Sequence, residues 1–233
     1  MIQQIYTDHQ NIKSGKSAVR NDNNGRFETD LLDTTNQEIS LNISIIGKDG
    51  DLAQALYNKL KTDHYVTYYG KEQFNFLQKD KISKLANLIY HSDIIISCPG
   101  VLTSHDSWDM FVINAVAPVF LMEKLIENKS KAHVVIVGSH GAMWTSWPNI
   151  SLERLSYNVS KETIQSFTTG LAHAGTSDLK LSIVNPSRFQ SKLNGYQGYS
   201  IDMVVDGIMH VIQAPTPILI YEYNNFQDVN RSD

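Results

Sequence analysis

Two side chains that could exchange a proton lie four residues apart in the second half of the chain. They are Tyr157 and Lys161, in the sequence Tyr-Asn-Val-Ser-Lys. On a helix, residues at this spacing share one face, with Cβ atoms about 5–6 Å apart. An ammonium group beside a phenol favours the phenolate and lowers the pKa of the tyrosine. The pair therefore predicts that Tyr157 is a general acid/base near neutral pH.

A glycine-containing turn indicates a second kind of chemistry, the binding of phosphate. Residues 47–53 read Gly-Lys-Asp-Gly-Asp-Leu-Ala and separate a β-branched segment from an amphipathic one. Glycine lets the backbone approach a pyrophosphate, and the following helix N-terminus offers N–H groups and a positive dipole. We expect a dinucleotide-binding turn, although an ordinary strand-to-helix turn is the alternative. Its binding residues would be Gly47, Lys48, Gly50, Asp51 and Leu52.

Charged residues near this turn bear on which dinucleotide would bind. Asp49 and Asp51 disfavour phosphate unless they point away, and Asp51 is well placed to be the N-cap of the helix. At the end of the next strand, an acidic residue would bind the ribose 2′-hydroxyl, but the chain has Lys71 there. Lys48 and Lys71 therefore favour a 2′-phosphate, and NADP(H) over NAD(H). Two solvated surface lysines are the alternative reading.

The segments around these motifs alternate between strand and helix patterns. Apolar, β-branched runs predict strands over residues 39–46, 64–69, 93–97, 133–137, 179–184 and 218–223, with a further short strand over 74–77. Helical spacing of apolar residues predicts helices over 51–61, 82–91, 108–128, 152–174 and 201–212. This alternation predicts an α/β domain, a doubly wound parallel sheet with helices on both faces.

Composition limits the class of protein. The 233 residues, 42% of them hydrophobic, suffice for one domain with a core, and the net charge of −4 disfavours nucleic acids and anionic membranes as partners. The single cysteine, Cys98, cannot form an intrachain disulfide. No apolar run reaches the roughly 18 residues of a membrane span, and the N-terminus lacks a signal-peptide pattern. We therefore expect a cytoplasmic protein.

The first 38 residues differ in composition from the rest. They are rich in Asn, Asp, Gln, Lys and Thr, and their apolar residues follow no clear period. We interpret residues 1–38 as a polar flexible arm before a domain at 39–233. An arm that packs on a partner subunit is the alternative.

Taken in order, these motifs resemble those of the short-chain dehydrogenase/reductase family over roughly residues 41–223. Each motif is common by chance, but their combination in this order is specific. The positions that match are Gly47, Gly50 and Ala53 in the glycine motif, Asn114 in a helix, Ser139 at the end of a strand, Tyr157 with Lys161, and Pro186 in the family's Pro-Gly segment.

The resemblance implies a Rossmann-like single domain that transfers hydride between a nicotinamide cofactor and a carbonyl or alcohol carbon. Tyr157 would protonate the carbonyl oxygen, and Ser139 would hydrogen-bond that oxygen as charge develops. Lys161 would bind the nicotinamide ribose, and Asn114 would hold a water that connects Lys161 to solvent. The partner would be a small-molecule carbonyl or alcohol. The family usually assembles through the helices that here carry Asn114 and Tyr157, so we expect a homodimer or homotetramer.

The chain also departs from the family. Ser97-Cys98-Pro99-Gly100 stands where the family usually has Asn-Asn-Ala-Gly, although Gly100 would still contact the cofactor. The stretch before Asp93 is short, so a crossover helix is expected to be missing or reduced. The segment 191–199 is also short, which predicts a reduced substrate lobe.

Aromatic residues beside these segments are candidates for the substrate site. Met143, Trp144 and Trp147 follow Ser139 and could form an apolar or ring-stacking wall. Tyr196 would face the same cleft from the other side, with Phe189 and Tyr199 as further candidates. A subunit contact or plain loop packing is the alternative for the wall.

Other functions fit the sequence less well. A non-catalytic protein that binds a dinucleotide as a redox sensor or structural ligand remains the main alternative. A serine hydrolase is disfavoured because Val137 occupies the first glycine of the Gly-x-Ser-x-Gly motif around Ser139. A metal site is not expected, since the eight histidines are scattered and no cysteine pair exists.

Overall fold

The computed structural model describes residues 40–102, 106–143, 151–175 and 177–222. The strands are β1 (Asn42–Ile46), β2 (Tyr65–Tyr69), β3 (Ile94–Ser97), β4 (His133–Val137), β5 (Lys180–Asn185) and β6 (Ile220–Glu222). The α-helices are α1 (Asp51–Leu60), α2 (Lys79–Ile89), α3 (Ser107–Phe111), α4 (Ala117–Glu127), α5 (Leu152–Ala174) and α6 (Ile201–Gln213). Three short helical segments complete them, η1 (Val112–Val116), η2 (His140–Met143) and η3 (Lys192–Asn194).

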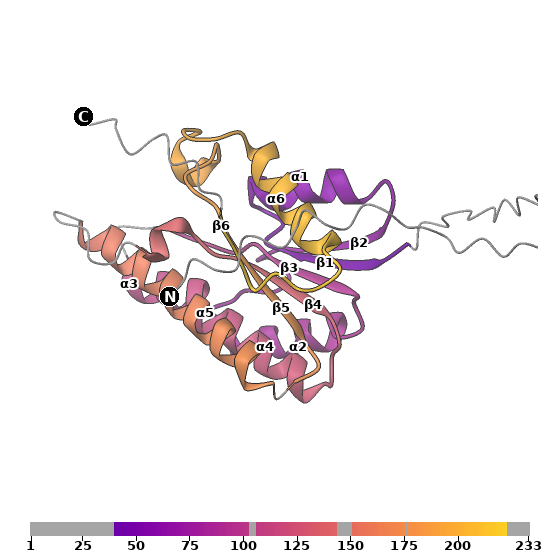
Figure 1. The fold of residues 1–233 in the computed structure, drawn as a ribbon. Helices are drawn as coiled ribbons and strands as arrows, with labels where there is room; N and C mark the ends of the chain where they lie inside the picture. Colours follow the sequence, from indigo (N-terminus) through magenta and orange to yellow (C-terminus); the bar gives the residue numbers. More distant parts are fainter. Residues whose placement is uncertain (1–39, 103–105, 144–150, 176, 223–233) are drawn as a thin grey trace, which may run out of the picture. The chain divides into compact units, whose positions relative to one another are not determined.

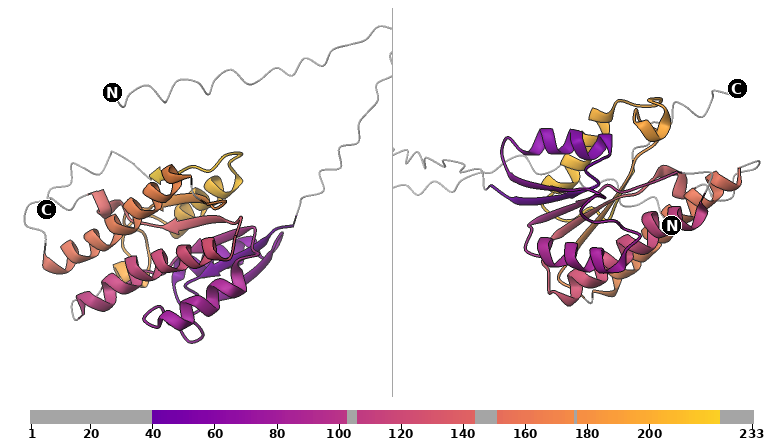
Figure 2. Two further views of the ribbon diagram at one scale, coloured as in Figure 1. Left: turned by 90° about the horizontal axis from the view of Figure 1, so that it is seen from below. Right: turned by 180° about the vertical axis from the view of Figure 1, so that it is seen from behind.

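All six strands form one parallel sheet in the order β2-β1-β3-β4-β5-β6. Helices α1 and α6 lie side by side on one face, and α2, α4 and α5 cover the other (Figure 1; Figure 2). The strand order reverses between β1 and β3, so their carboxyl ends diverge into a crevice of the kind in which α/β proteins bind ligands. The predicted doubly wound parallel α/β fold is confirmed.

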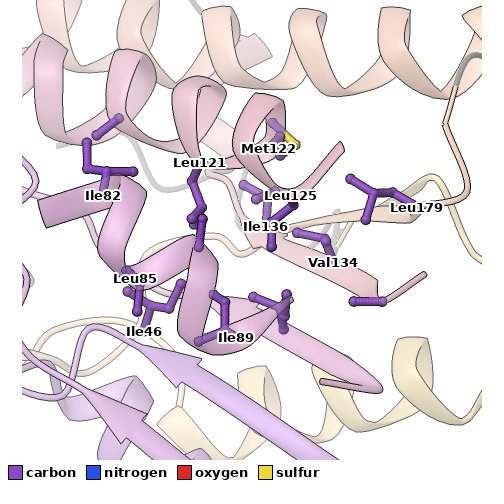
Figure 3. Close-up of a cluster of buried hydrophobic side chains, with 14 of the residues drawn as sticks. Ile46, Ile82, Leu85, Ile89, Leu121, Met122, Leu125, Val134, Ile136 and Leu179 are labelled. Carbon is purple, nitrogen blue, oxygen red and sulfur yellow. The ribbon is translucent and has the colours of Figure 1, made fainter. Parts of the chain in front are cut away.

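Apolar residues on both sides of the strands form two cores. On β4, for example, Val134 and Ile136 face α2, α4 and α5, whereas Val135 and Val137 face α1 and α6. Figure 3 shows the first of these cores, in which side chains of α2 and α4 close over the sheet. Because both faces of the sheet are covered, β3 and most of β4 and β5 are buried, and most of their residues are apolar.

The predicted strand at residues 74–77 is wrong. Phe74 donates its N–H to the carbonyl of Gly70 at 3.0 Å, and the segment forms turns that insert the buried side chain of Phe76 into the core. A parallel strand needs a crossover of a dozen or more residues after its predecessor, and only a few residues separate Phe74 from β2. A single helix of 11 residues, α2, connects β2 to β3.

The remaining elements agree with the sequence patterns, with shifts of a few residues at their ends. The helix predicted at 108–128 is one helical stretch divided into α3, η1 and α4. Between β5 and α6 the chain forms η3, tight turns and one isolated β-bridge between Phe189 and Tyr199. The proposed arm at residues 1–38 lies outside the described residues.

Candidate active site

The glycine turn after β1 is packed tightly against the ends of two other strands. Gly47 has φ +104°, and a β-carbon there would lie 3.2 Å from the backbone nitrogen of Pro99 and 3.3 Å from the Cys98 Cβ. The N–H groups of Gly47 and Lys48 both donate to the carbonyl of Tyr69, at 2.9 and 3.0 Å. Only glycine fits this conformation and this space. The turn therefore lies where the ends of β1, β2 and β3 meet.

Helix α1 begins one residue earlier than the capping prediction requires. Gly50 is the N-cap and carries no side-chain cap, while Asp51 is the first helical residue, so the prediction of Asp51 as N-cap is wrong. The Asp51 carboxylate instead accepts the N–H of Lys192 at 2.7 Å. Leu52, the next residue of α1, is buried in the core.

Three charged residues gather around the end of β2. Asp49 accepts the N–H of Lys71 at 3.4 Å, and the Lys48 ammonium lies 5.6 Å from the centre of the Tyr68 ring. Lys48, Asp49 and Lys71 are exposed. The carboxylate of Asp49 therefore connects the glycine turn that contains Lys48 with the backbone of Lys71, just after β2.

A π-helical turn positions Asn114. In an α-helix, the N–H of residue 118 would bond to the carbonyl of residue 114, but Pro118 has no N–H. The N–H of Ala117 bonds instead to the carbonyl of Val112, five residues back, which is the π-helical pattern of η1. Such turns occur frequently at functional sites.

The Asn114 side chain ties the segment after β3 to helix α5. Its Oδ1 accepts the N–H of Val101 and its Nδ2 donates to the Val101 carbonyl, each at 2.9 Å. Nδ2 also donates to Ser160 Oγ at 3.1 Å, and Ser160 Oγ donates to the Tyr157 carbonyl at 2.7 Å. Asn114 and Ser160 are both buried. The side chain of Asn114 is therefore a structural link between the two segments.

Lys161 projects from α5 into the protein between the ends of β3 and β4. Its Nζ donates to the carbonyl of Val137 at 3.0 Å and lies 3.3 Å from where a β-carbon on Gly100 would be. Burial lowers the pKa of Lys161 to about 8, against a smaller opposing effect of the Cys98 thiol. Burial raises the pKa of Cys98 to about 12, so this thiol is neutral at physiological pH. Lys161 is therefore a buried amine close to the end of β3.

Tyr157 and Ser139 meet beside this amine. Ser139 Oγ accepts the N–H of Gly141 at 3.1 Å, and Ser139 hydrogen-bonds the Tyr157 side chain. Burial raises the pKa of Tyr157, and the Ser139 bond and the charge of Arg154 oppose it only in part. The expected lowering by Lys161 is therefore wrong for this structure, because desolvation dominates and the ammonium bonds to the Val137 carbonyl.

A buried amide that the sequence patterns did not indicate holds Ser139 in place. Asn185, at the end of β5, accepts the N–H of Ser139 at 3.1 Å and donates to Gln165 of α5 at 2.6 Å. A β-carbon on Gly138 would lie 2.1 Å from the Asn185 oxygen, so this glycine makes room for the amide. A polar residue directly before Pro186, closing an apolar strand, was the available signal.

The candidate substrate residues are less well grouped. Trp144 and Trp147 lie outside the described residues, as does the side chain of Met143. The buried Pro186 accepts the N–H of His140 at 3.0 Å, which joins the end of β5 to the loop after Ser139. Tyr196 is 61% exposed and bonds through its N–H to the carbonyl of Ser191, within the short β5–α6 segment.

Among the described residues, no group of three or more His, Cys, Asp or Glu side chains could hold a metal ion. None of the helices in this part of the chain is long and apolar enough to cross a membrane.

Solved structures with this fold are numerous. The chain is similar to the protein lin1944 from Listeria innocua, with 15% identity and a TM-score of 0.66 over 79% of this chain and 100% of the other. A short-chain dehydrogenase from Burkholderia cenocepacia in complex with NADP has 14% identity and a TM-score of 0.65 over 80% and 89%. The 3-alpha-hydroxysteroid dehydrogenase from a Pseudomonas species, complexed with NADH, has 17% identity and a TM-score of 0.63 over 78% and 95%.

Sequence comparisons give no such relation. No family model matches the chain, and no curated protein matches it. The structural likeness establishes the fold, which is that of the short-chain dehydrogenases/reductases.

Proposed function

We propose that this chain, which has the short-chain dehydrogenase/reductase fold, is an NAD(P)(H)-dependent oxidoreductase acting on a carbonyl or alcohol carbon. One observation carries the proposal. Ser139, Tyr157 and the buried amine of Lys161 lie together at the carboxyl ends of β3 and β4, next to the glycine turn. In this fold class, that edge of the sheet is where ligands bind.

The residues around the turn fit a nicotinamide dinucleotide. Gly47 keeps the turn free of a side chain, and α1 begins without a side-chain cap, which suits a phosphate. The Lys161 amine, within 3.3 Å of the β-carbon position at Gly100, could bind ribose hydroxyls there. Gly100 and Pro186 would line the same site. The bound nicotinamide would supply or accept the hydride.

The proton chemistry would be carried by Tyr157. A raised pKa keeps its phenol protonated at neutral pH, as a proton donor for carbonyl reduction must be. Ser139 would hydrogen-bond the substrate oxygen as negative charge develops on it. Lys161 would stabilise the phenolate left after the proton transfer. The amide nitrogen of Asn114 is fully engaged with Val101 and Ser160, so a water there would bond to its side-chain oxygen or its main chain.

We propose a preference for NADP(H) because Lys48 and Lys71 lie together beside the end of β2. A 2′-phosphate would gain two cationic partners there, and Asp49 would oppose it only in part. The substrate would lie between Ser139 and the segment that contains Tyr196, with Met143, Trp144 and Trp147 as its wall. A cytoplasmic location stays a prediction.

We also propose assembly through the helices that carry Asn114 and Tyr157. Trp108 and Leu152, near the N-terminal ends of these helical segments, are 74% and 76% exposed, which is unusual for such large apolar side chains. Sedimentation at micromolar concentration is expected to give a dimer or tetramer. A monomer under these conditions would contradict this part of the proposal.

The proposed function is tested by titrating the purified protein with NADPH and NADH. Binding is expected to quench tryptophan fluorescence and to raise the thermal midpoint, because a ligand that binds only the folded state stabilises it. A panel of aldehydes and ketones is then tested for oxidation of the bound cofactor. Binding with turnover supports the enzyme, binding without turnover favours the non-catalytic alternative, and no binding contradicts both.

A further inference from the structure

Asp51 presents a problem for the proposed function. It is the first residue of α1, and its carboxylate lies at the helix N-terminus where a dinucleotide would place its pyrophosphate. A carboxylate and a phosphate repel each other, and this repulsion is strong near a poorly solvated group. A chain that binds a dinucleotide here must therefore neutralise or redirect Asp51. The following inference rests on the proposed function and refines its cofactor site.

A residue distant in sequence makes two contacts with this carboxylate. Lys192, which begins η3, donates its backbone N–H to Asp51 Oδ2 at 2.7 Å. The Lys192 ammonium also lies 3.5 Å from Asp51 Oδ1. The segment between β5 and α6 lies on the same side of the sheet as α1 (Figure 1). The two contacts therefore hold the η3 turn against the start of α1.

The two contacts differ in strength. A short hydrogen bond from a backbone N–H to a carboxylate is charge-assisted and strong, and the Asp51 side chain is only 20% exposed. The Lys192 side chain is 66% exposed. An ion pair with such an exposed partner contributes little to stability. The backbone of η3 is thus fixed, whereas the ammonium can turn to another anion at low cost.

The η3 turn is internally braced, so its position depends on few contacts. The carbonyl of Ser191 accepts the N–H groups of Asn194 and Tyr196, at 3.0 and 2.9 Å, and Ser191 is buried. Asp51 is the residue of α1 that bonds to this turn. The Asp51 carboxylate therefore fixes the position of the Lys192 backbone, from which the Lys192 side chain projects.

We propose that Asp51 positions the η3 turn and that the Lys192 ammonium binds the pyrophosphate of the dinucleotide. The acidic residue in the glycine turn would then serve cofactor binding, since it brings a cation to the helix N-terminus. Lys48 and Lys71 lie at the end of β2 and would act on the ribose. The three lysines would thus bind different parts of one ligand.

The first experiment measures the affinity of Lys192→Gln for NADPH, NADH and ADP-ribose at low and raised KCl. Affinity for all three ligands is expected to fall about tenfold at low salt, since each carries the pyrophosphate. The salt dependence of binding should also become shallower. Lys192→Arg should restore both. Lys84→Gln is the matched control, because the Lys84 side chain is as exposed as that of Lys192, at 66%, and pairs with Asp80 of α2 at 3.6 Å.

Two substitutions of Asp51 separate its positioning role from its charge. Asp51→Asn keeps an acceptor for the Lys192 N–H and removes the repulsion, so dinucleotide affinity should stay equal or rise. Asp51→Ala loses the acceptor, so affinity should fall while Lys192→Gln in the same background costs little more. Thermal midpoints measured without ligand identify any variant that merely folds poorly.

The outcomes distinguish the inference from the proposed function. If the wild-type protein binds no dinucleotide, both are overturned. If it binds but Lys192→Gln stays within about twofold, or keeps the full salt dependence, only the role of Lys192 is overturned. Equal losses in Lys192→Gln and Lys84→Gln would also overturn it.

Discussion

The two sides of the crevice are built from different contacts. Around Tyr157, the supporting residues Asn114, Ser160 and Asn185 are at most 1% exposed. Each side chain forms a hydrogen bond with a backbone group, which for Ser160 lies within α5 itself. Around the glycine turn, charged side chains such as Lys48 and Lys71 are exposed and make few contacts. The first side is therefore fixed by folding itself, whereas the second can change its charges without disturbing the core.

This difference separates two kinds of substitution. Changes on the buried side should alter the rate of the reaction or the free energy of unfolding. Changes on the charged side should alter which dinucleotide binds and how tightly. The following predictions test that separation, from the largest expected effect to the smallest.

Tyr157→Phe should reduce turnover at least about a hundredfold, because it removes the proposed proton donor. Dinucleotide affinity should stay nearly unchanged, since the ring still fills the same buried space. Steady-state kinetics and cofactor titration measure the two effects. Unchanged turnover would show that Tyr157 is not the proton donor. A loss of cofactor binding without a loss of turnover would contradict the proposed separation between the two sides of the crevice.

Lys161→Met should remove a pH dependence of the free energy of unfolding. The pKa of Lys161 is lowered to about 8 in the folded protein, from an ordinary value of 10.5. Below pH 8 the amine is charged in both the folded and the unfolded protein, and burying its charge is unfavourable. Between about pH 8 and 10.5 the amine is neutral in the folded protein but still charged in the unfolded one, so the free energy of unfolding rises with pH. The wild type should therefore gain stability relative to Lys161→Met by on the order of 3 kcal/mol across this window.

Denaturant unfolding of both proteins at several pH values measures this difference. Comparing the two proteins cancels the opposite effect of Tyr157, whose pKa is raised by burial. Parallel stability curves would show that the Lys161 amine is better solvated than its burial indicates.

Gly138→Ala should destabilise the protein by about 1–3 kcal/mol, because the new methyl group would overlap the Asn185 amide and force it or Ser139 to move. Turnover should fall as well, since Asn185 holds the backbone of Ser139. Thermal unfolding and kinetics measure both. Gly170→Ala is the control, because a β-carbon there meets nothing within 4 Å and alanine should stabilise α5 by up to about 1 kcal/mol. Equal stability of the two variants would contradict the packing argument.

The double substitution of Lys48 and Lys71 by Gln should weaken NADPH binding about tenfold and change NADH binding by less than about twofold. The 2′-phosphate, present only in NADPH, would lose both of its cationic partners. Parallel titrations with the two cofactors measure the ratio, and thermal midpoints should not move. An equal loss for both cofactors would mean that the lysines act on a group that NADH also has.

Patterns within single segments predicted most of the fold. The apolar runs of β3 and β4 and the helical spacing in α5 follow from which residues are buried, and this pattern is visible in the sequence. The strand proposed at residues 74–77 was wrong because Phe76 is buried without belonging to the sheet. An apolar residue indicates that a position is buried, but not whether that position lies in a strand, a helix or a turn.

The spacing of residues within one element is visible in the sequence, but the contacts between elements are not. Tyr157 and Lys161 are four apart on α5, so their spacing is visible in the sequence. The contacts of Ser139 with Asn185 and of Asp51 with Lys192 join residues far apart in the chain. The pKa of Tyr157 could not be judged from Lys161 alone, since its direction depends on burial by the whole fold.

The π-helical turn η1 lets this helix hold one extra residue without changing which face each half turns to the core. A π-helical turn holds one residue more than an α-helical turn, so deleting a single residue near Ile113 should leave an α-helical turn there. In a regular α-helix, the same deletion would rotate one half by about 100° relative to the other. Here the fully buried Met110 should keep its place in the core. This segment should therefore tolerate the loss of one residue better than a regular helix does.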